Sequence, residues 1–189
     1  DVIEVEGQGK KTYMLTNGGV GLPALAAELA NQFRYNLQKW SQAQSTKSGI
    51  KQLSTQTRNL IKKMGPSIYS LTIAEALRTW NPQDWGLEIE IPGNKILQTR
   101  SALLLINNLP QIGSSFTPAP LTSNSDGTVN LLVTEDEKLM EYLQSAVQIR
   151  LGSIIKSKRV KSYELQQFTL RTKSQRGLTF FGDGEILHK

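Results

Sequence analysis

The sequence predicts an α+β domain, mainly an antiparallel β-sandwich-like fold with a few packed helices. Three observations support this prediction. The 189 residues are 38% hydrophobic, which is enough to bury a sizeable core. Apolar residues recur at helical spacing in only a few stretches. The remaining apolar residues form short alternating or continuous runs between turns rich in Gly, Pro and Asn, a pattern typical of strands.

The first elements expected are a short strand, a glycine loop and a helix. Thr12–Leu15 suits the strand, and Asn17–Gly21 is interpreted as the loop. Pro23 fits the first turn of the helix. The apolar stripe of this helix is Leu22, Leu25, Leu29, Phe33, Leu37 and Trp40. A glycine loop before a helix can bind phosphate, but this one lacks the P-loop lysine and the full dinucleotide fingerprint.

The next part of the chain is expected to be helical or exposed. Residues 41–58 are polar and suit an exposed connection or a solvated helical extension. A second helix is expected over Ile68–Trp80, where apolar residues again recur at helical spacing until Asn81-Pro82 ends the pattern.

Strand patterns dominate after this helix. Leu87–Ile91 alternates strictly, Ala102–Ile106 is continuously apolar, and Thr128–Val133 is a third run. Residues 107–126 form a long loop of Asn, Pro, Gly and Ser, and loops of this length inside a compact domain are often functional.

One more helix and the last strands complete the prediction. Thr134 and Glu137 form a capping-box signature for a helix that ends near Ile149. The inner stripe expected for this helix is Leu139, Leu143 and Val147. The strands expected after it are Val160, Tyr163–Arg171 and Leu178–Phe181, around a turn at Lys173–Gly177.

The residue types restrict the possible sites. Cysteine is absent and His188 is the single histidine, so any metal must be bound by oxygen. No apolar run approaches the roughly 20 residues of a membrane span, and the acidic start does not resemble a signal peptide, so we expect a cytoplasmic protein. Because the first residue is Asp and not Met, we also expect a piece of a longer chain.

The net charge is +6 and the pI is near 9.6. The basic residues form two groups, Lys47, Lys51, Arg58, Lys62 and Lys63, and Arg150, Lys156, Lys158, Arg159 and Lys161. Such groups can bind phosphates, nucleic acid or an anionic membrane, or they can form a solvated face. Aromatic residues do not alternate with them as in a single-strand binding surface, so we expect no nucleic acid.

Two acidic turns interrupt the strand patterns, at Asn124–Gly127 and Gly182–Glu185. Glycine supplies the backbone freedom that holds a carboxylate at a strand end, where it can meet a ligand or a metal. Asp-Gly pairs are also common hairpin connectors, so both interpretations stay open.

Five segments occur in an order that carries a family resemblance. They are Met14–Gly21, Gly65–Tyr69, Leu103–Asn108 with Gly113, Ala119–Gly127, and Gly182–Glu185. Together they resemble the C-terminal domain of the diacylglycerol kinase catalytic family of lipid kinases, which is sphingosine kinase-like and of the NAD kinase-type superfamily. The resemblance covers nearly the whole chain. It implies that residues 1–189 are the C-terminal lipid-substrate domain of such a kinase.

The resemblance also implies site residues. Glu185 matches the family's candidate general base, which takes the proton from a lipid hydroxyl as that hydroxyl attacks the γ-phosphate of ATP. The side chain of Asp126 with the backbone oxygens of Ser123 and Thr128 matches a structural Mg²⁺ site. Ser125 stands where the family has an Asp, which is a departure at that metal site.

The family's nucleotide-binding Gly-Gly-Asp-Gly-Thr is not found in this sequence. Ser125–Thr128 imitates its end but precedes a strand pattern, whereas a phosphate loop opens a helix. We therefore expect the ATP site on an N-terminal kinase domain outside this chain. The lipid substrate is expected at a membrane surface, with the protein cytoplasmic and peripheral. Two alternatives stay open: a non-catalytic lipid- or membrane-binding module, and a basic nucleic-acid-binding domain.

Overall fold

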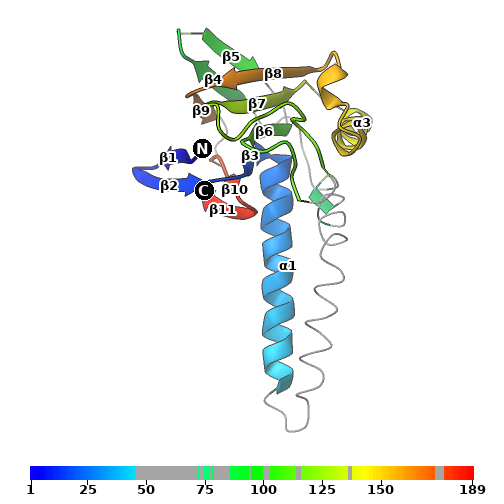
Figure 1. Ribbon diagram of the computed structural model, residues 1–189. Coiled ribbons are helices and arrows are strands. Elements are labelled where there is room, and N and C mark those ends of the chain that lie inside the picture. The colour runs from blue at the N-terminus through cyan, green and yellow to red at the C-terminus, as the bar shows by residue number, and fades with distance from the viewer. Residues whose placement is uncertain are drawn as a thin grey trace.

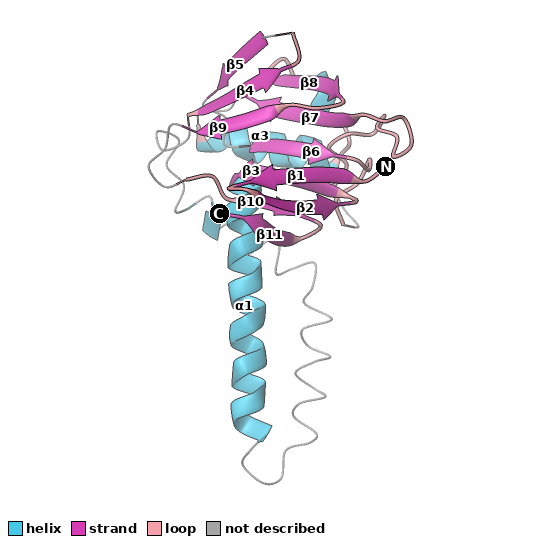
Figure 2. Ribbon diagram, turned by 90° about the vertical axis from the view of Figure 1, so that its left-hand side faces the viewer, coloured by secondary structure: helices cyan, strands magenta, loops and turns pink. Residues whose placement is uncertain are grey.

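The fold is a β sandwich with helices on its outer side, as Figures 1 and 2 show for a computed structural model of the chain. The structure describes residues 1–45, 72, 75–76, 78, 86–93, 95–99, 103–113, 116–135, 138–172 and 177–189. A six-stranded sheet has the order β11-β10-β3-β6-β7-β8. A two-stranded sheet, β1-β2, and a three-stranded sheet, β5-β4-β9, pack on one face, and α1 and α3 lie on the other. The predicted α+β, sandwich-like fold is confirmed.

The strands are β1 Ile3–Gly7, β2 Lys10–Met14, β3 Asn17–Gly21, β4 Leu87–Ile91, β5 Lys95–Thr99, β6 Leu103–Asn107, β7 Val129–Thr134, β8 Val160–Leu165, β9 Thr169–Thr172, β10 Phe180–Gly182 and β11 Glu185–His188. The helices are α1 Leu22–Ser45 and α3 Leu139–Arg150, with a short 3-10 turn, η2, at Ile154–Lys156. All pairings between these strands are antiparallel.

The middle strands of the large sheet are buried on both faces, which explains their continuous apolar sequence. Leu104 and Ile106 of β6 and Leu131 of β7 face the smaller sheets. Leu105 of β6 and Leu132 of β7 face the helices. Alternate residues of a strand point to opposite faces, so one short run supplies both cores.

The strict alternation of β4 reflects burial on one face of the strand only. Its apolar positions, Leu87, Ile89 and Ile91, are buried against the large sheet. Its outward positions, Glu88 and Glu90, form ion pairs with Arg171 of β9. The strand therefore has one buried and one solvated face, as the sequence predicted.

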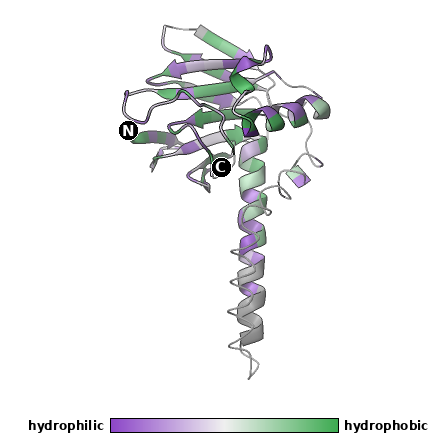
Figure 3. Cartoon of the chain, turned by 45° about the vertical axis from the view of Figure 1, so that its right-hand side comes forward, coloured by the Kyte–Doolittle hydropathy of each residue, from purple (hydrophilic) through white to green (hydrophobic). Residues whose placement is uncertain are grey.

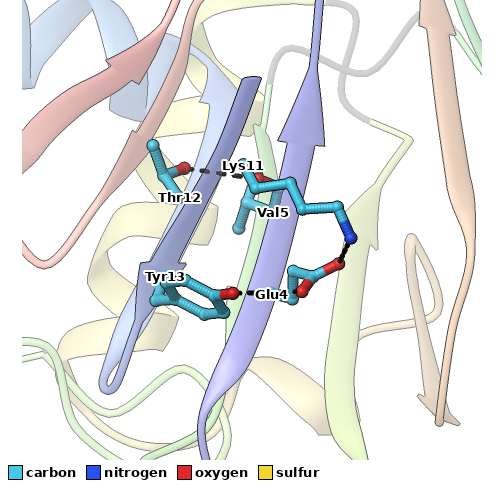
Figure 4. A network of polar contacts seen from close by, with 5 residues as sticks. All are labelled: Glu4, Val5, Lys11, Thr12 and Tyr13. Carbon is cyan, nitrogen blue, oxygen red and sulfur yellow. Dashed lines mark hydrogen bonds and ion pairs between the residues drawn. The ribbon is translucent and has the colours of Figure 1, made fainter. Parts of the chain in front are cut away.

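The N-terminal hairpin, β1 and β2, closes the lower part of the sandwich. Across it, Glu4 accepts hydrogen bonds from Lys11 Nζ at 2.7 Å and from the Tyr13 hydroxyl at 3.3 Å (Figure 4). The Thr12 hydroxyl lies 2.9 Å from Nε2 of His188 in β11. The single histidine thus links the hairpin to the edge strand of the large sheet.

The glycine loop expected at Asn17–Gly21 is wrong, because this segment is β3, in the interior of the large sheet. A Cβ on Gly19 would lie 2.2 Å from the carbonyl oxygen of Leu104, and one on Gly18 would lie 2.6 Å from that of Phe181. Glycine is needed here for the close approach of neighbouring strands and not for a turn. The segment's place in the sheet ladder also removes the phosphate-loop interpretation.

Helix α1 begins where the sequence predicted, but it packs through smaller side chains. Ala24 and Ala27 lie in the core beneath the sheet. Leu25 and Leu29 are half-buried, and Phe33 is 40% exposed. Figure 1 shows the reason, since α1 continues beyond the sandwich and only its first turns contact the sheet.

Two further predictions concern residues that the structure describes only in part. The side chains of Leu37 and Trp40, and most of the predicted helix at 68–80, lie outside the described residues. Thr72, Glu75, Ala76 and Arg78 are described, and all four are helical.

The capping box predicted for the later helix is wrong. Thr134 is the last residue of β7 and is fully buried. The helix, α3, begins at Leu139, and Lys138 precedes it. The carboxylate of Glu141, in the first turn, accepts a hydrogen bond from the backbone N–H of Lys138 at 3.0 Å. Glu141 therefore supplies the N-terminal cap that the sequence analysis assigned to Glu137, which lies outside the described residues.

The predicted inner face of α3 is also wrong. Tyr142, Ser145 and Ile149 are the buried residues, whereas Leu143 and Val147 are 41% and 57% exposed. Both sets have helical spacing, so periodicity alone could not decide which one faces the sheet.

Gly19→Ala is expected to lower the free energy of unfolding by about 1–3 kcal/mol or more, because the new methyl group cannot fit beside the Leu104 carbonyl. Urea denaturation would measure the change. Gly86→Ala is the matched control, since no atom lies within 4 Å of its added Cβ. Equal effects of the two substitutions would contradict the close packing assigned to β3.

Candidate functional site

The two acidic turns lie at the same end of the six-stranded sheet. Asp183 follows β10, and Asp126 precedes β7, with β3 and β6 between these strands. Three strand spacings separate β10 from β7, or about 14 Å. The two turns therefore lie at one end of the sheet but are too far apart to bind the same metal ion.

The carboxylate of Asp183 is fixed by three hydrogen bonds. Its Oδ2 accepts from the backbone N–H of Leu15 at 2.9 Å, and its Oδ1 accepts from the N–H of Thr16 at 2.8 Å and from the Thr16 hydroxyl at 2.6 Å. Partial burial opposes ionisation, but the Thr16 hydroxyl and the two amides outweigh it, so the pKa of Asp183 is lowered. Asp183 has a φ of 53° and Gly184 a φ of 84°, so both turn residues are left-handed.

Glu185 differs from Asp183 in its surroundings. It is the first residue of β11, pairs with Gly182, and is exposed. Within the described part of the chain, its carboxylate has no hydrogen bond and no ion pair. The turn is therefore anchored by one acid and presents a second acid to solvent.

Buried asparagines line the sheet between the two turns, and sequence analysis did not identify them as a group. They are Asn17, Asn107, Asn108 and Asn130. Asn107 pairs with Asn17 on one side and with Asn130 on the other, so three of them lie on one rung of the sheet. The amide oxygens of Asn107 and Asn108 are buried without a hydrogen-bond partner among the described residues. In the sequence, Asn17 and Asn107-Asn108 look like loop residues, whereas Asn130 falls inside the predicted strand Thr128–Val133.

Hydrogen bonds connect the two turns. Leu15 donates its N–H to Asp183, and its carbonyl accepts from the side-chain amide of Asn108 at 2.7 Å. The same amide donates to the carbonyl of Asp1 at 3.0 Å. The side chain of Asp1 accepts from the N–H of Gly127 at 2.8 Å. We call the end of the six-stranded sheet that carries the two acidic turns, Asn124–Gly127 and Gly182–Glu185, the acidic edge. These hydrogen bonds make it one connected network.

The predicted metal ligands surround the second turn. Oδ1 of Asp126 accepts hydrogen bonds from the N–H of Thr128 at 3.0 Å and from its hydroxyl at 2.9 Å. Both hydrogen bonds lower the pKa of Asp126, and the bond from the backbone N–H has the larger effect. The hydroxyls of Ser123 and Ser125 lie 3.3 Å apart. The donors are all oxygens, on two exposed residues, Ser123 and Asp126, and on the partly buried Thr128, which suits a hard cation, although the carboxylate is engaged by Thr128.

Among the described residues, Asp1 is the acid bound beside Asp126 at this turn. In the described ranges, no group of three or more His, Cys, Asp or Glu residues is placed to hold a metal ion. The segment also precedes β7 and opens no helix, as predicted from the sequence, so it is unlike a phosphate-binding loop.

The basic groups differ in how far they are neutralised. Arg159 pairs with Glu141 and Lys161 with Glu135. Lys47, Lys51, Arg58, Lys62 and Lys63 lie outside the described residues. Among the helices that the structure describes, none has the length and apolar character needed to cross a membrane.

Comparisons with known proteins agree with the fold. The family model of the YegS C-terminal NAD kinase beta sandwich-like domain matches residues 44–189. A solved protein of Bacillus anthracis str. Sterne, assigned as a diacylglycerol kinase, matches with a TM-score of 0.52 and 14% identity over 98% of this chain and 50% of that chain. A second, assigned likewise and from the same organism, has a TM-score of 0.51 and 15% identity over 100% and 53% of the two chains.

This chain thus spans about half the length of the solved proteins it matches. At these identities the likeness shows the fold alone. No curated protein matches the sequence.

Asp183→Asn is expected to lower the free energy of unfolding at pH 7 by about 1–2 kcal/mol, because a neutral amide weakens three charge-assisted hydrogen bonds at a partly solvated site. Asn tolerates the left-handed backbone, so the change isolates the charge. Because the folded pKa of Asp183 is lowered, its stabilisation is complete above the unfolded value of about 3.9 and is lost as the pH falls through the folded pKa.

Urea denaturation from pH 7 to pH 2 would measure this dependence. The difference between wild type and Asp183→Asn should decrease as the pH falls below about 3.9. Glu6→Gln, which removes an exposed carboxylate from β1, is the control and should show little difference at any pH. A difference for Asp183→Asn that stays constant to pH 2 would contradict the role assigned to the carboxylate.

Proposed function

This chain belongs to the family of YegS C-terminal NAD kinase beta sandwich-like domains, and we propose that it is the C-terminal lipid-substrate half of an ATP-dependent lipid kinase. The substrate is a lipid hydroxyl, as in diacylglycerol or a sphingoid base. The residues proposed for the chemistry lie at the acidic edge of the large sheet.

The observation that carries this proposal is that one turn carries a hydrogen-bonded acid and an exposed acid. Asp183 is held by Leu15 and Thr16, and Glu185 is exposed two residues later. A general base must be positioned and must also be accessible to the proton that it takes. This arrangement supports Glu185 as the base and Asp183 as its positioning residue.

In the proposed reaction, the carboxylate of Glu185 accepts the proton of the lipid hydroxyl. The hydroxyl oxygen then forms a bond to the γ-phosphorus of ATP, and the bond from that phosphorus to the bridging oxygen breaks, so that ADP leaves. A primary alcohol is a poor nucleophile while it keeps its proton, which is why a carboxylate is needed at this place.

The ATP-binding part of the kinase is proposed to lie outside this chain. The solved proteins that match the fold are about twice as long. The missing half is proposed to be an N-terminal kinase domain that contacts the acidic edge and brings the triphosphate to Glu185. The lipid and the protein would meet at a membrane surface, with the protein peripheral and cytoplasmic.

The Mg²⁺ ligands remain part of the proposal. Asp126 would contribute its side chain, and Ser123 and Thr128 their backbone oxygens. The all-oxygen donor set supports a hard cation of this kind. Such a cation would stabilise the turn before β7, at a distance from the reacting groups.

Glu185→Gln in the full-length gene product is expected to reduce turnover by about 100-fold or more, because the amide cannot accept the hydroxyl proton. Transfer of the γ-phosphate from ATP to lipid alcohols in mixed micelles would measure it. Glu6→Gln, an exposed change on β1, should keep full activity. A folded protein without activity on any lipid alcohol would argue against a kinase.

The same variant separates the alternatives. In a non-catalytic lipid-binding module, Glu185→Gln would leave lipid affinity unchanged and no turnover would be found in wild type. A nucleic-acid-binding domain would instead retard DNA in a gel, with an affinity that falls steeply as salt is added.

Mg²⁺ is expected to raise the thermal unfolding midpoint of the wild-type protein, with a stabilisation of about 2.7 kcal/mol at 100 times the dissociation constant. Asp126→Asn should lose most of this increase because it removes the charged ligand, and Ser125→Ala should keep it. Differential scanning fluorimetry with NaCl at matched ionic strength measures the effect. Equal Mg²⁺ responses of wild type and Asp126→Asn would rule out Asp126 as the ligand.

A further inference from the structure

The outward face of α3 is apolar. It carries a stripe, called here the α3 stripe, formed by Met140, Leu143, Val147 and Leu151; together with Ile155 of η2, which follows the helix, these residues are 65%, 41%, 57%, 72% and 39% exposed. At about 100° per residue, the first four lie within an arc of roughly 80°. Figure 3 shows α3 on the outer side of the molecule, where apolar and polar segments are both present.

The exposure of this stripe is not explained by the packing of the helix. Tyr142, Ser145 and Ile149 already bury the opposite face of α3 against the fold. A surface helix normally has polar residues on its solvent side. A contiguous apolar surface with a charged rim marks a place of contact with a partner or a membrane.

The charges around the stripe are positive. Lys138, Arg150, Lys156 and Lys158 are exposed, and no carboxylate of the described residues pairs with them. The single acid within α3, Glu141, is neutralised by Arg159 at 3.7 Å. Asp136 and Glu137, before the helix, lie outside the described residues.

We propose that the α3 stripe and its basic rim dock onto the surface of an anionic lipid bilayer, with α3 lying in the plane of the interface. The inference rests on the proposed function and deepens it, since it assigns the surface on which a lipid kinase would meet its substrate. A helix with apolar residues on one side and Lys or Arg at its flanks is the form that binds charged interfaces. Each basic residue near such a surface strengthens binding by about fivefold.

Charge favours a bilayer over a second copy of the chain. Basic residues lie at both ends of α3, at Lys138 and Arg150. Two copies joined through the stripe would bring these like charges together in either orientation. An anionic surface instead complements every charge on the rim.

The docking surface is separate from the acidic edge. α3 leads through η2 into β8, whereas the turn with Glu185 joins β10 to β11, and β8 and β11 are opposite edges of the sheet. Substitutions in the stripe therefore leave Asp183 and Glu185 untouched, so membrane binding and catalysis can be tested apart.

The test is co-sedimentation of the full-length gene product with vesicles of phosphatidylcholine, with and without phosphatidylserine, in the absence of ATP. Val147→Glu should weaken binding to the anionic vesicles by about tenfold or more, since it places a charge in the apolar contact. Lys156→Ala with Lys158→Ala should weaken it by a similar factor. Ile96→Glu and Lys10→Ala, which change an exposed apolar and an exposed basic residue elsewhere, are the controls and should bind as wild type.

Circular dichroism and thermal unfolding would establish that each variant is folded. Wild-type binding by folded Val147→Glu, or equal binding to charged and uncharged vesicles, would overturn the inference. So would self-association or DNA binding that Val147→Glu alone abolishes, since the occupant would then be a second copy or a nucleic acid.

The two proposals fail in different ways. If Val147→Glu loses vesicle binding but the wild type has no kinase activity, only the proposed function fails. If the wild type phosphorylates lipid in micelles but Val147→Glu binds vesicles normally, only the docking surface fails.

Discussion

The close approach of β3 to its two neighbours is the constraint on which the rest of the structure depends. Gly18 and Gly19 bring the backbones of β10 and β6 into contact with the middle of the sheet. Because β10 pairs there, the turn that follows it lies beside Thr16, where Asp183 can be bound. A Cβ at position 18 or 19 would push these strands apart. Both cores of the sandwich and the position of Glu185 therefore depend on glycine at positions 18 and 19.

The polar end of the sheet is the counterpart of its apolar middle. Buried amides normally find hydrogen-bond partners, and the side-chain nitrogens of these asparagines do, although the amide oxygens of Asn107 and Asn108 have none among the described residues. Asn17 donates its side-chain amide to the carbonyl of Gln111 at 2.6 Å, and Asn130 donates to the Ser162 hydroxyl at 2.8 Å. These bonds hold the loop after β6 and the edge strand β8 in place. The acidic turns thus follow strand ends that these hydrogen bonds hold in place, which favours precise placement of a reactive group.

The sequence was informative where burial leaves a clear pattern. The buried strand β6, the alternation of β4 and the start of α1 followed from their apolar spacing, and the two acidic turns followed from their Asp-Gly pairs. The misses have physical causes. Glycines in β3 carry no apolar signal, and Asn107 at the end of β6 looks like a loop residue because its burial depends on partners from other strands. In α3 two apolar stripes compete, and only tertiary contact decides which one turns inward. The base and metal roles came from resemblance, because no spacing in the chain encodes them.

The hydrogen bonds of Asp1 have a consequence for any polypeptide joined ahead of it. The backbone nitrogen of Asp1 donates to the carbonyl of Asn124, and its side chain is bound by Gly127. A tether entering here would emerge directly beside the acidic edge, and as an amide its nitrogen could still donate. A folded unit on a short tether has an effective concentration in the millimolar range. Even a weak contact between that unit and the edge would then be occupied most of the time, without a large dedicated interface.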